Sequence, residues 1–229
     1  MKKLFLVLFL LMAVSCTILP PSAPIVPVDP VLAEKCSSLY PIKSFRAVHA
    51  LSASMFGDRK TTFIGITVAD MPSNRIRCNM LSIEGMVLFD ATSINKTLTI
   101  HQAITPMDKQ GFAQGLFSDV EFIYFPPQGT LIGAEVNADG TIICRWQNNH
   151  RLVERSSEVS GRSILTERSE SLDVLRRAEF FPPLVNGFYQ KILLEVFDVG
   201  GAGELGGYFL SMEFLEGEPI TPPDDLFAP

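Results

Sequence analysis

An alternating segment at residues 75–90, RIRCNMLSIEGMVLFD, constrains the fold of this chain more than any other feature. Ile76, Cys78 and Met80 are apolar and are separated by polar residues. A period of two is typical of a strand that buries one face. Gly85 can adopt a positive φ at little cost, and a second apolar strand follows it. The segment therefore predicts an antiparallel hairpin.

Segments with the same alternation flank this hairpin on both sides. Strands are predicted at residues 43–56, 61–69, 96–102, 130–136, 141–147, 187–198 and 207–215. Residues 151–181 are more polar and carry charges on both faces, which indicates wet, partly exposed strands. The short connections between these segments indicate a strongly twisted antiparallel sheet.

Two helices accompany the predicted strands. Residues 108–124 place Phe112, Leu116 and Val120 at helical spacing, and Asp108 stands where it could cap the first turn. A shorter helix is expected at about residues 30–40. The elements together predict a mainly β (α+β) fold, in which one or two helices cover a curved antiparallel half-barrel sheet of about ten strands.

Residues 1–15 have the features of a signal peptide. Lys2 and Lys3 precede an unbroken apolar run that is shorter than the ~20 residues a membrane-spanning helix needs. Ser15 stands immediately before Cys16, an arrangement that resembles the bacterial lipobox. The resemblance implies that the precursor is cleaved before Cys16 and that this cysteine is lipidated. The alternative is a soluble periplasmic protein in which Cys16 is free or disulfide-bonded.

The segment at residues 16–30 is rich in proline, which favours an extended tether that reaches roughly 40 Å. Thr17, rather than an acidic residue, follows Cys16. By resemblance to the enterobacterial sorting pattern, this favours the outer membrane, with the domain facing the periplasm. Residues 31–216 are expected to form one domain, and residues 217–229 a disordered tail.

The composition limits the partners and the disulfides of the domain. A net charge of −6 makes nucleic acid and anionic membrane surfaces poor candidates. If Cys16 is acylated, then Cys36, Cys78 and Cys144 remain, and at most one disulfide can form in an oxidising compartment. The residues do not select which pair forms it.

Few residues suggest reaction chemistry. Residues 201–206 spell GxGxxG, but no strand–helix–strand unit surrounds them, so a glycine-rich hairpin loop is expected instead. His49, His101 and His150 lack the spacing of metal ligands. His49 lies on the apolar face of a predicted strand, which is typical of a hydrogen-bonded interior histidine. We therefore expect no enzyme, no catalytic residue, no metal site and no cofactor.

Residues 45–124 resemble the amino-terminal part of the LolA/LolB-type lipoprotein carriers, in which a half-barrel sheet is covered by helices over an apolar cavity. The resemblance covers about a third of the chain and rests on patterns rather than invariant motifs. It depends on the strand succession and on Arg75, Ile76, Arg77, Leu81, Gly85, Leu88 and Phe89. It implies that the ligands are lipid acyl chains or lipoproteins.

The resemblance also implies two sets of site residues. Candidates for the wall of the apolar cavity are Ile64, Ile66, Val68, Ile76, Cys78, Leu98, Ile100, Phe112, Leu116 and Val120. In the outer-membrane receptors of the family, an apolar residue on the central hairpin loop helps to pass acyl chains to the membrane. Met80, Leu81 and Ile83 occupy this region here, but Ile83 and Glu84 stand where the receptors have Pro-Leu before the glycine.

The sequence thus predicts a bacterial outer-membrane lipoprotein, anchored through Cys16, that acts as a carrier or receptor for acyl chains. The same apolar faces are also compatible with plain core packing. The alternative function is a non-enzymatic envelope scaffold or protein-interaction module with a filled core, since polar strands at residues 151–181 could offer exposed edges to a partner. Which protein would be the partner stays open.

Overall fold

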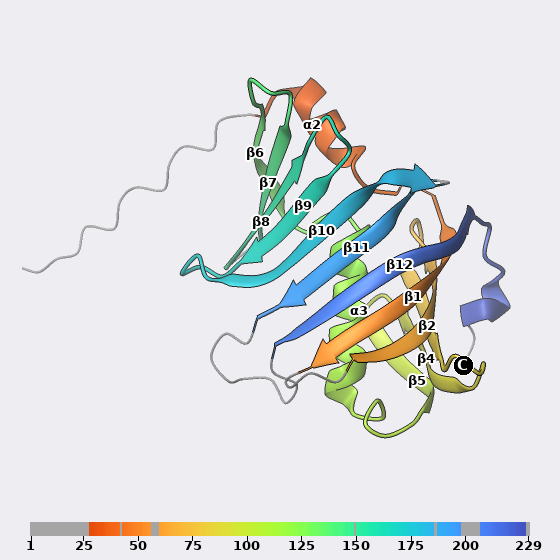
Figure 1. The fold of residues 1–229 in the computed structure, drawn as a ribbon. Helices are drawn as coiled ribbons and strands as arrows, with labels where there is room; N and C mark the ends of the chain where they lie inside the picture. The colour runs from red at the N-terminus through yellow and green to blue at the C-terminus, as the bar shows by residue number, and fades with distance from the viewer. Residues whose placement is uncertain are drawn as a thin grey trace, which may run out of the picture.

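A computed structural model of the chain describes residues 28–41, 43–55, 60–148, 150–185, 187–197 and 207–227. These residues form a twelve-stranded antiparallel sheet in the order β5-β4-β3-β2-β1-β12-β11-β10-β9-β8-β7-β6. The sheet curls around one long helix, α3, and a shorter helix, α2, lies at the β6–β7 edge (Figure 1). The predicted fold class, a curved antiparallel half-barrel with helices, is confirmed.

The observed elements follow the sequence closely. The helices are α2 (Pro30–Ser37), α3 (Gln110–Tyr124) and the short 3-10 helix η2 (Asp224–Phe227). The strands are β1 (Phe45–Met55), β2 (Lys60–Asp70), β3 (Arg75–Leu81), β4 (Val87–Ile94), β5 (Thr97–Ala103), β6 (Thr130–Val136), β7 (Ile142–Asn148), β8 (Arg151–Ser157), β9 (Ser163–Arg168), β10 (Val174–Val185), β11 (Phe188–Val196) and β12 (Tyr208–Pro219). No helix among these residues is long and apolar enough to cross a membrane.

The last strand joins the two halves of the sheet. β12 pairs with β11 on one side and with β1 on the other, so that Leu51 lies opposite Met212 and Met212 opposite Ile192. In the C-terminal half, β8 pairs with β7 and β9, and β10 pairs with β9 and β11, so none of these three strands is an edge strand. The partly exposed strands expected at residues 151–181 are present, with one face buried and the other partly exposed. The expectation that they offer exposed edges is wrong, because the edge strands are β5 and β6.

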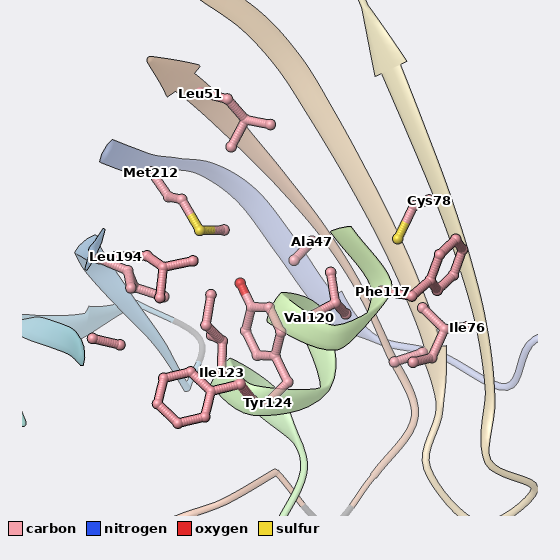
Figure 2. Close-up of a cluster of buried hydrophobic side chains, with 14 of the residues drawn as sticks. Ala47, Leu51, Ile76, Cys78, Phe117, Val120, Ile123, Tyr124, Leu194 and Met212 are labelled. Carbon is pink, nitrogen blue, oxygen red and sulfur yellow. The ribbon is translucent and has the colours of Figure 1, made fainter. Parts of the chain in front are cut away.

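Helix α3 covers the concave face of the sheet and builds the main core. Phe117, Val120, Ile123 and Tyr124 face strand residues that include Ala47 (Figure 2). Each fully buried large apolar side chain contributes roughly 1.5–3 kcal/mol to stability, so this face holds the helix on the sheet. The cap predicted at Asp108 is wrong. The helix begins two residues later, and the Asp108 carboxylate accepts a hydrogen bond from the Thr105 hydroxyl instead (2.9 Å).

A disulfide between Cys36 and Cys144 joins α2 to β7, with the two Cα atoms 5.9 Å apart. Helix α2 starts where Asp29 caps it, because the Asp29 carboxylate accepts a hydrogen bond from the Val31 amide at 2.7 Å. Cys78 is a free, buried thiol. The structure thus selects one pairing from those that the sequence left open.

The C-terminal residues fold onto the convex face of β3. Phe227 is only 2% exposed, and the Arg75 guanidinium lies 4.6 Å above its ring. Arg77 donates a hydrogen bond to the Leu226 carbonyl oxygen at 2.6 Å. The prediction of a disordered tail at residues 217–229 is therefore wrong for residues 217–227. Residues 217–219 belong to β12, and Arg75, Arg77 and the buried Phe227 ring hold the segment that follows. Residues 228 and 229 lie outside the described part of the chain.

Candidate functional site

A cavity of about 440 Å³ opens at one end of the concave face. Its wall comes from the segment that leads into β1, from the last turn of α3, and from β8, β10 and β11. The volume lies within the range of ~300–1,000 Å³ that is usual for small-molecule sites. The cavity exists because α3 packs closely against the N-terminal half of the sheet but ends at Tyr124, before it covers this corner.

Aromatic side chains form most of the apolar wall. The rings of Phe45 and Phe188 meet edge to face with their centroids 5.3 Å apart, and Phe180 and Ile192 add further apolar surface. Rings in this arrangement attract each other beyond their area of contact. The wall is therefore rigid and apolar, and it suits a hydrocarbon ligand.

A neutral histidine lies in the inner wall. His49 is 2% exposed, and its Nε2 atom lies 3.3 Å from the Tyr124 hydroxyl oxygen. Burial disfavours the charged imidazolium and lowers the pKa of His49 to about 4. His49 is thus the hydrogen-bonded interior histidine that the sequence predicts.

A buried arginine is the most unusual feature of the cavity. Arg155 is 1% exposed, and its guanidinium lies between two aromatic rings, 4.5 Å from the centre of Tyr40 and 4.9 Å from that of Phe180. Its Nε atom donates to the Ser163 hydroxyl at 3.0 Å, and Nη2 lies 3.4 Å from the Tyr189 hydroxyl oxygen. Among the described residues, no carboxylate lies within ion-pair distance of it.

The Tyr40 hydroxyl is buried beside this arginine and has no hydrogen-bond partner in the described part of the chain. Burial raises the pKa of Tyr40, so the hydroxyl stays protonated. The neighbouring Arg155 guanidinium lowers the pKa of the Tyr40 hydroxyl, but burial has the larger effect. The cavity therefore presents a cation and an unused polar group inside a wall with many apolar residues.

A second buried ionic group fastens α3 to the sheet, away from the cavity. Arg176 contacts Glu167 at 2.5 Å and Asp119 at 3.3 Å, and the Tyr208 hydroxyl donates to Asp119. Burial raises the pKa of Asp119 to about 6. Arg151 also pairs with Glu167 at 2.9 Å, so two arginines balance the two carboxylates, which is typical of a structural role. Within the described residues, no group of three or more histidines, cysteines or acidic residues could hold a metal ion.

Comparison with solved structures identifies the architecture. A LolA superfamily protein from Nitrosomonas europaea superposes with a TM-score of 0.56 at 11% sequence identity, over 87% of this chain and 96% of that one. The chain has a LolA-like fold. A lipoprotein-sorting domain from Vibrio parahaemolyticus (TM-score 0.46, 6% identity, 86% and 95% coverage) and a DUF1329 family protein from Desulfovibrio piger (0.45, 9%, 86% and 94%) are more distantly similar. No protein-family model and no curated protein matches the sequence.

Three of the expected cavity residues lie on the wrong face of the LolA-like sheet. Phe63 and Ala69 of β2 pack into the core, so their alternates Ile64, Ile66 and Val68 face the convex side. The prediction failed because the inward positions of β2 include Gly65 and Thr67, which are less apolar than the outward ones.

The remaining seven candidates lie on the core side but not at the cavity. Three of them, Ile76, Cys78 and Val120, are buried in the main core. The other four are partly buried and pack against it: Leu98, Ile100, Phe112 and Leu116. None of the seven lines the cavity of about 440 Å³, because α3 fills the space above the strands that carry them.

The loop between β3 and β4 exposes apolar side chains. Ile83 is 72% exposed and Met86 is 62% exposed, whereas Leu81 is half-buried and Met80 points into the core. Of the three residues expected at the transfer loop, only Ile83 therefore stands well out into solvent. No residue of this loop lines the cavity.

Sequence reasoning missed the polar residues of the cavity. Val153 and Arg155 share one face of β8, so the arginine occupies an inward position of an alternating strand. A charged residue in the apolar phase of a strand is the signal that could have identified it. Cys16 and the glycine-rich residues 201–206 lie outside the described part of the chain.

Proposed function

We propose that this chain is a cell-envelope lipoprotein whose LolA-like half-barrel binds a lipid acyl chain. The cavity of about 440 Å³ beside the last turn of α3 is the observation that carries the proposal. A methylene group occupies ~30 Å³, the volume of one water molecule in the liquid, so the cavity has room for on the order of a dozen methylene groups. This capacity suits one acyl chain better than a whole diacyl lipid.

The expected affinity is useful and reversible. Burial of a methylene contributes about 0.8 kcal/mol, so even half of a long acyl chain contributes on the order of 5 kcal/mol. The wall needs little rearrangement, since the rings of Phe45 and Phe188 pack against each other within it. A carrier requires such reversible binding, because it must also release the chain.

The membrane attachment is part of the proposal. Cys16 carries the lipid, the proline-rich residues 17–30 act as a tether, and the anchor holds the domain at the outer membrane. Ile83 and Met86 on the β3–β4 loop are then apolar side chains that can touch the bilayer. Because no residue of this loop lines the cavity, the loop serves as a membrane contact and not as the cavity entrance.

The test is to measure lipid in the protein. The chain recovered from cells is extracted with organic solvent and analysed by mass spectrometry, and uptake of a fluorescent fatty acid is measured. Ile192→Trp should fill the cavity and lower uptake at least tenfold, because Ile192 is buried in its wall. Val136→Trp on the exposed face of β6 is the matched control. If the parent chain shows no co-purified lipid and no fatty-acid uptake, the proposal is refuted.

The scaffold alternative is less well supported. It requires exposed strand edges at residues 151–181, but the strands there are paired on both sides. The described cavity also argues against a filled interior at that end of the sheet. We assign no reaction to the cavity, since its polar groups, a neutral histidine and an arginine among tyrosines, do not form a nucleophile–base pair.

A further inference from the structure

The cavity wall carries positive charge, whereas the chain as a whole is negatively charged. The chain has a net charge of −6, yet the described wall contains no aspartate or glutamate, and its charged side chains are Arg155 and Lys43. His49 in the same wall is neutral at pH 7 because burial lowers its pKa to about 4. The cavity is thus a local positive site in an acidic protein.

A buried arginine without a carboxylate is costly. Taking a guanidinium out of water costs several kcal/mol unless an opposite charge and hydrogen bonds compensate it, and buried charges are normally paired. The stacking of Arg155 between Tyr40 and Phe180 compensates part of this cost. The hydrogen bonds of Arg155 to described residues use only its Nε and Nη2 atoms, so a planar group with five N–H donors keeps capacity for an acceptor.

The guanidinium is also held in place before any ligand arrives. Ser163 accepts the Nε hydrogen bond and itself donates to the Ser156 carbonyl oxygen at 2.9 Å. The two flanking rings fix the plane of the group. Next to it, the buried Tyr40 hydroxyl has no partner among the described residues and is free to donate. The Arg155 guanidinium and the Tyr40 hydroxyl therefore offer two donors from neighbouring residues in the cavity wall.

We infer that the cavity binds a single-chain amphiphile with a carboxylate head group, of the class of long-chain fatty acids. The carboxylate lies against Arg155 and receives a hydrogen bond from the Tyr40 hydroxyl, and the hydrocarbon chain lies along Phe45, Phe188 and Ile192. Arginine pairs with carboxylates through two parallel hydrogen bonds, which gives selectivity for the ionised head. The inference rests on the proposed function and adds to it that the free acid is preferred over neutral lipid chains.

The experiment compares head groups on one chain length at pH 8. The full chain, kept in phospholipid nanodiscs where it is membrane-bound, is photocrosslinked with a diazirine fatty acid, and dodecanoic acid, dodecanol and acetate compete. In the parent chain, dodecanoic acid should compete at a concentration at least ~10-fold below that of dodecanol, which corresponds to about 1.4 kcal/mol. Crosslinks should map to peptides that contain Tyr189 or Phe188.

Variants of Arg155 and Tyr40 test whether these residues bind the carboxylate head group. Arg155→Met and Tyr40→Phe should each reduce the preference for the acid, with Arg155→Met bringing the two competitors within about twofold. Arg145→Met is the matched control, because Arg145 lies on the adjacent strand and pairs with Glu154 and Glu135 outside the cavity. Thermal unfolding of each variant verifies folding. Since Tyr40→Phe removes only a hydroxyl that lacks a partner, it keeps the test valid if Arg155→Met does not fold.

Each other outcome is decisive. Equal competition by acid and alcohol in the parent chain overturns the inference and leaves acyl-chain binding intact. An unchanged preference in folded Arg155→Met also overturns it. No crosslinking and no competition by either lipid overturns the proposed function itself. If acetate competes at concentrations similar to those of dodecanoic acid, the cavity is a site for small anions, and the inference that it binds an amphiphile is overturned.

Discussion

Cys144 and Arg155 are direct register partners on β7 and β8. Cys144 is bonded to Cys36 of α2, and the chain continues from α2 to Tyr40, whose ring lies beneath the Arg155 guanidinium. The disulfide therefore fixes both sides of the same contact, because it holds the segment that carries Tyr40 against the strand that lies beside Arg155. The Tyr40 ring also meets Trp146 edge to face at 6.0 Å, next to the bridge.

Removal of this disulfide should destabilise the domain. The cysteines are 108 residues apart, so the bridge restricts a large loop in the unfolded chain. The double variant Cys36→Ala with Cys144→Ala should lose about 2–4 kcal/mol of unfolding free energy, measured by urea denaturation. Cys78→Ala, which removes the buried free thiol, is the control and should lose about 1 kcal/mol. Equal losses in both variants would contradict the assigned bridge.

His49 should make the folded state sensitive to acid. Its pKa is lowered from 6.5 to about 4 in the folded state, so below pH 6.5 the unfolded chain binds a proton that the folded chain does not. The stability is fully present above pH 6.5 and is lost as the pH falls toward 4, by up to about 3 kcal/mol. Urea denaturation at a series of pH values measures this slope.

His49→Phe should remove that part of the pH dependence. Asp119 acts in the opposite direction in the same window, because burial raises its pKa to about 6 and its protonation in the folded state stabilises the fold at lower pH. The difference between the parent chain and His49→Phe isolates the histidine, since Asp119 is present in both. Parallel pH profiles for the two proteins would show that His49 does not titrate as its burial requires.

Alternation predicted strand positions well and strand faces less well. The bounds of β3 agree closely with the sequence because its apolar and polar residues alternate without interruption, and every second side chain is buried. In β2 the alternation is equally clear, but Ile64, Ile66 and Val68 lie on the convex side. Both faces of this strand are partly covered, and Val68 is buried although it lies outside the main core. When both faces are covered, hydrophobicity alone cannot identify the inner one.

The cavity depends on relationships that no local pattern records. Arg155 stands in the inward phase of β8, but its burial also requires that β8 pairs with β7 and β9 and that the rings of Tyr40 and Phe180 cover it. Tyr40 reaches the same position only because the disulfide holds the segment after α2 against β7. The sequence could indicate that an apolar cavity is compatible with the fold. Its position at the end of α3 follows from where the helix stops, at Tyr124.

Phe227 should anchor the C-terminal segment. Its ring is 2% exposed against the convex face and lies below the Arg75 guanidinium. Phe227→Ala should lower the unfolding free energy by about 2–4 kcal/mol and should make residues 220–227 more sensitive to limited proteolysis. Asp225→Ala, at an exposed neighbour, is the control and should change stability by less than about 0.5 kcal/mol. An unchanged cleavage pattern in Phe227→Ala would contradict the docked segment.

Gly217 should tolerate no side chain, because a Cβ atom there would lie 2.7 Å from Phe214 and 2.9 Å from Phe188. These two rings are stacked 5.3 Å apart, and Phe188 also lines the cavity. Gly217→Ala should therefore cost about 1–3 kcal/mol of unfolding free energy and reduce fatty-acid uptake. Gly133→Ala is the control, since its nearest neighbour atom would be 3.9 Å away. Unaltered uptake in a destabilised Gly217→Ala protein would show that Phe188 does not shape the ligand site.

Cys16 should be lipidated in the mature protein. The mature N-terminal peptide should start at Cys16 and carry a thioether-linked diacylglycerol and an acylated amine, as mass spectrometry of that peptide would show. One acyl chain gives only marginal membrane binding, whereas two or three together give stable attachment. Cys16→Ser should block lipidation and leave the precursor uncleaved, while Cys78→Ser should be processed normally. An unmodified Cys16, or a mature chain that begins after it, would refute the anchor, and acyl-chain binding by the domain would then have to be explained without membrane attachment.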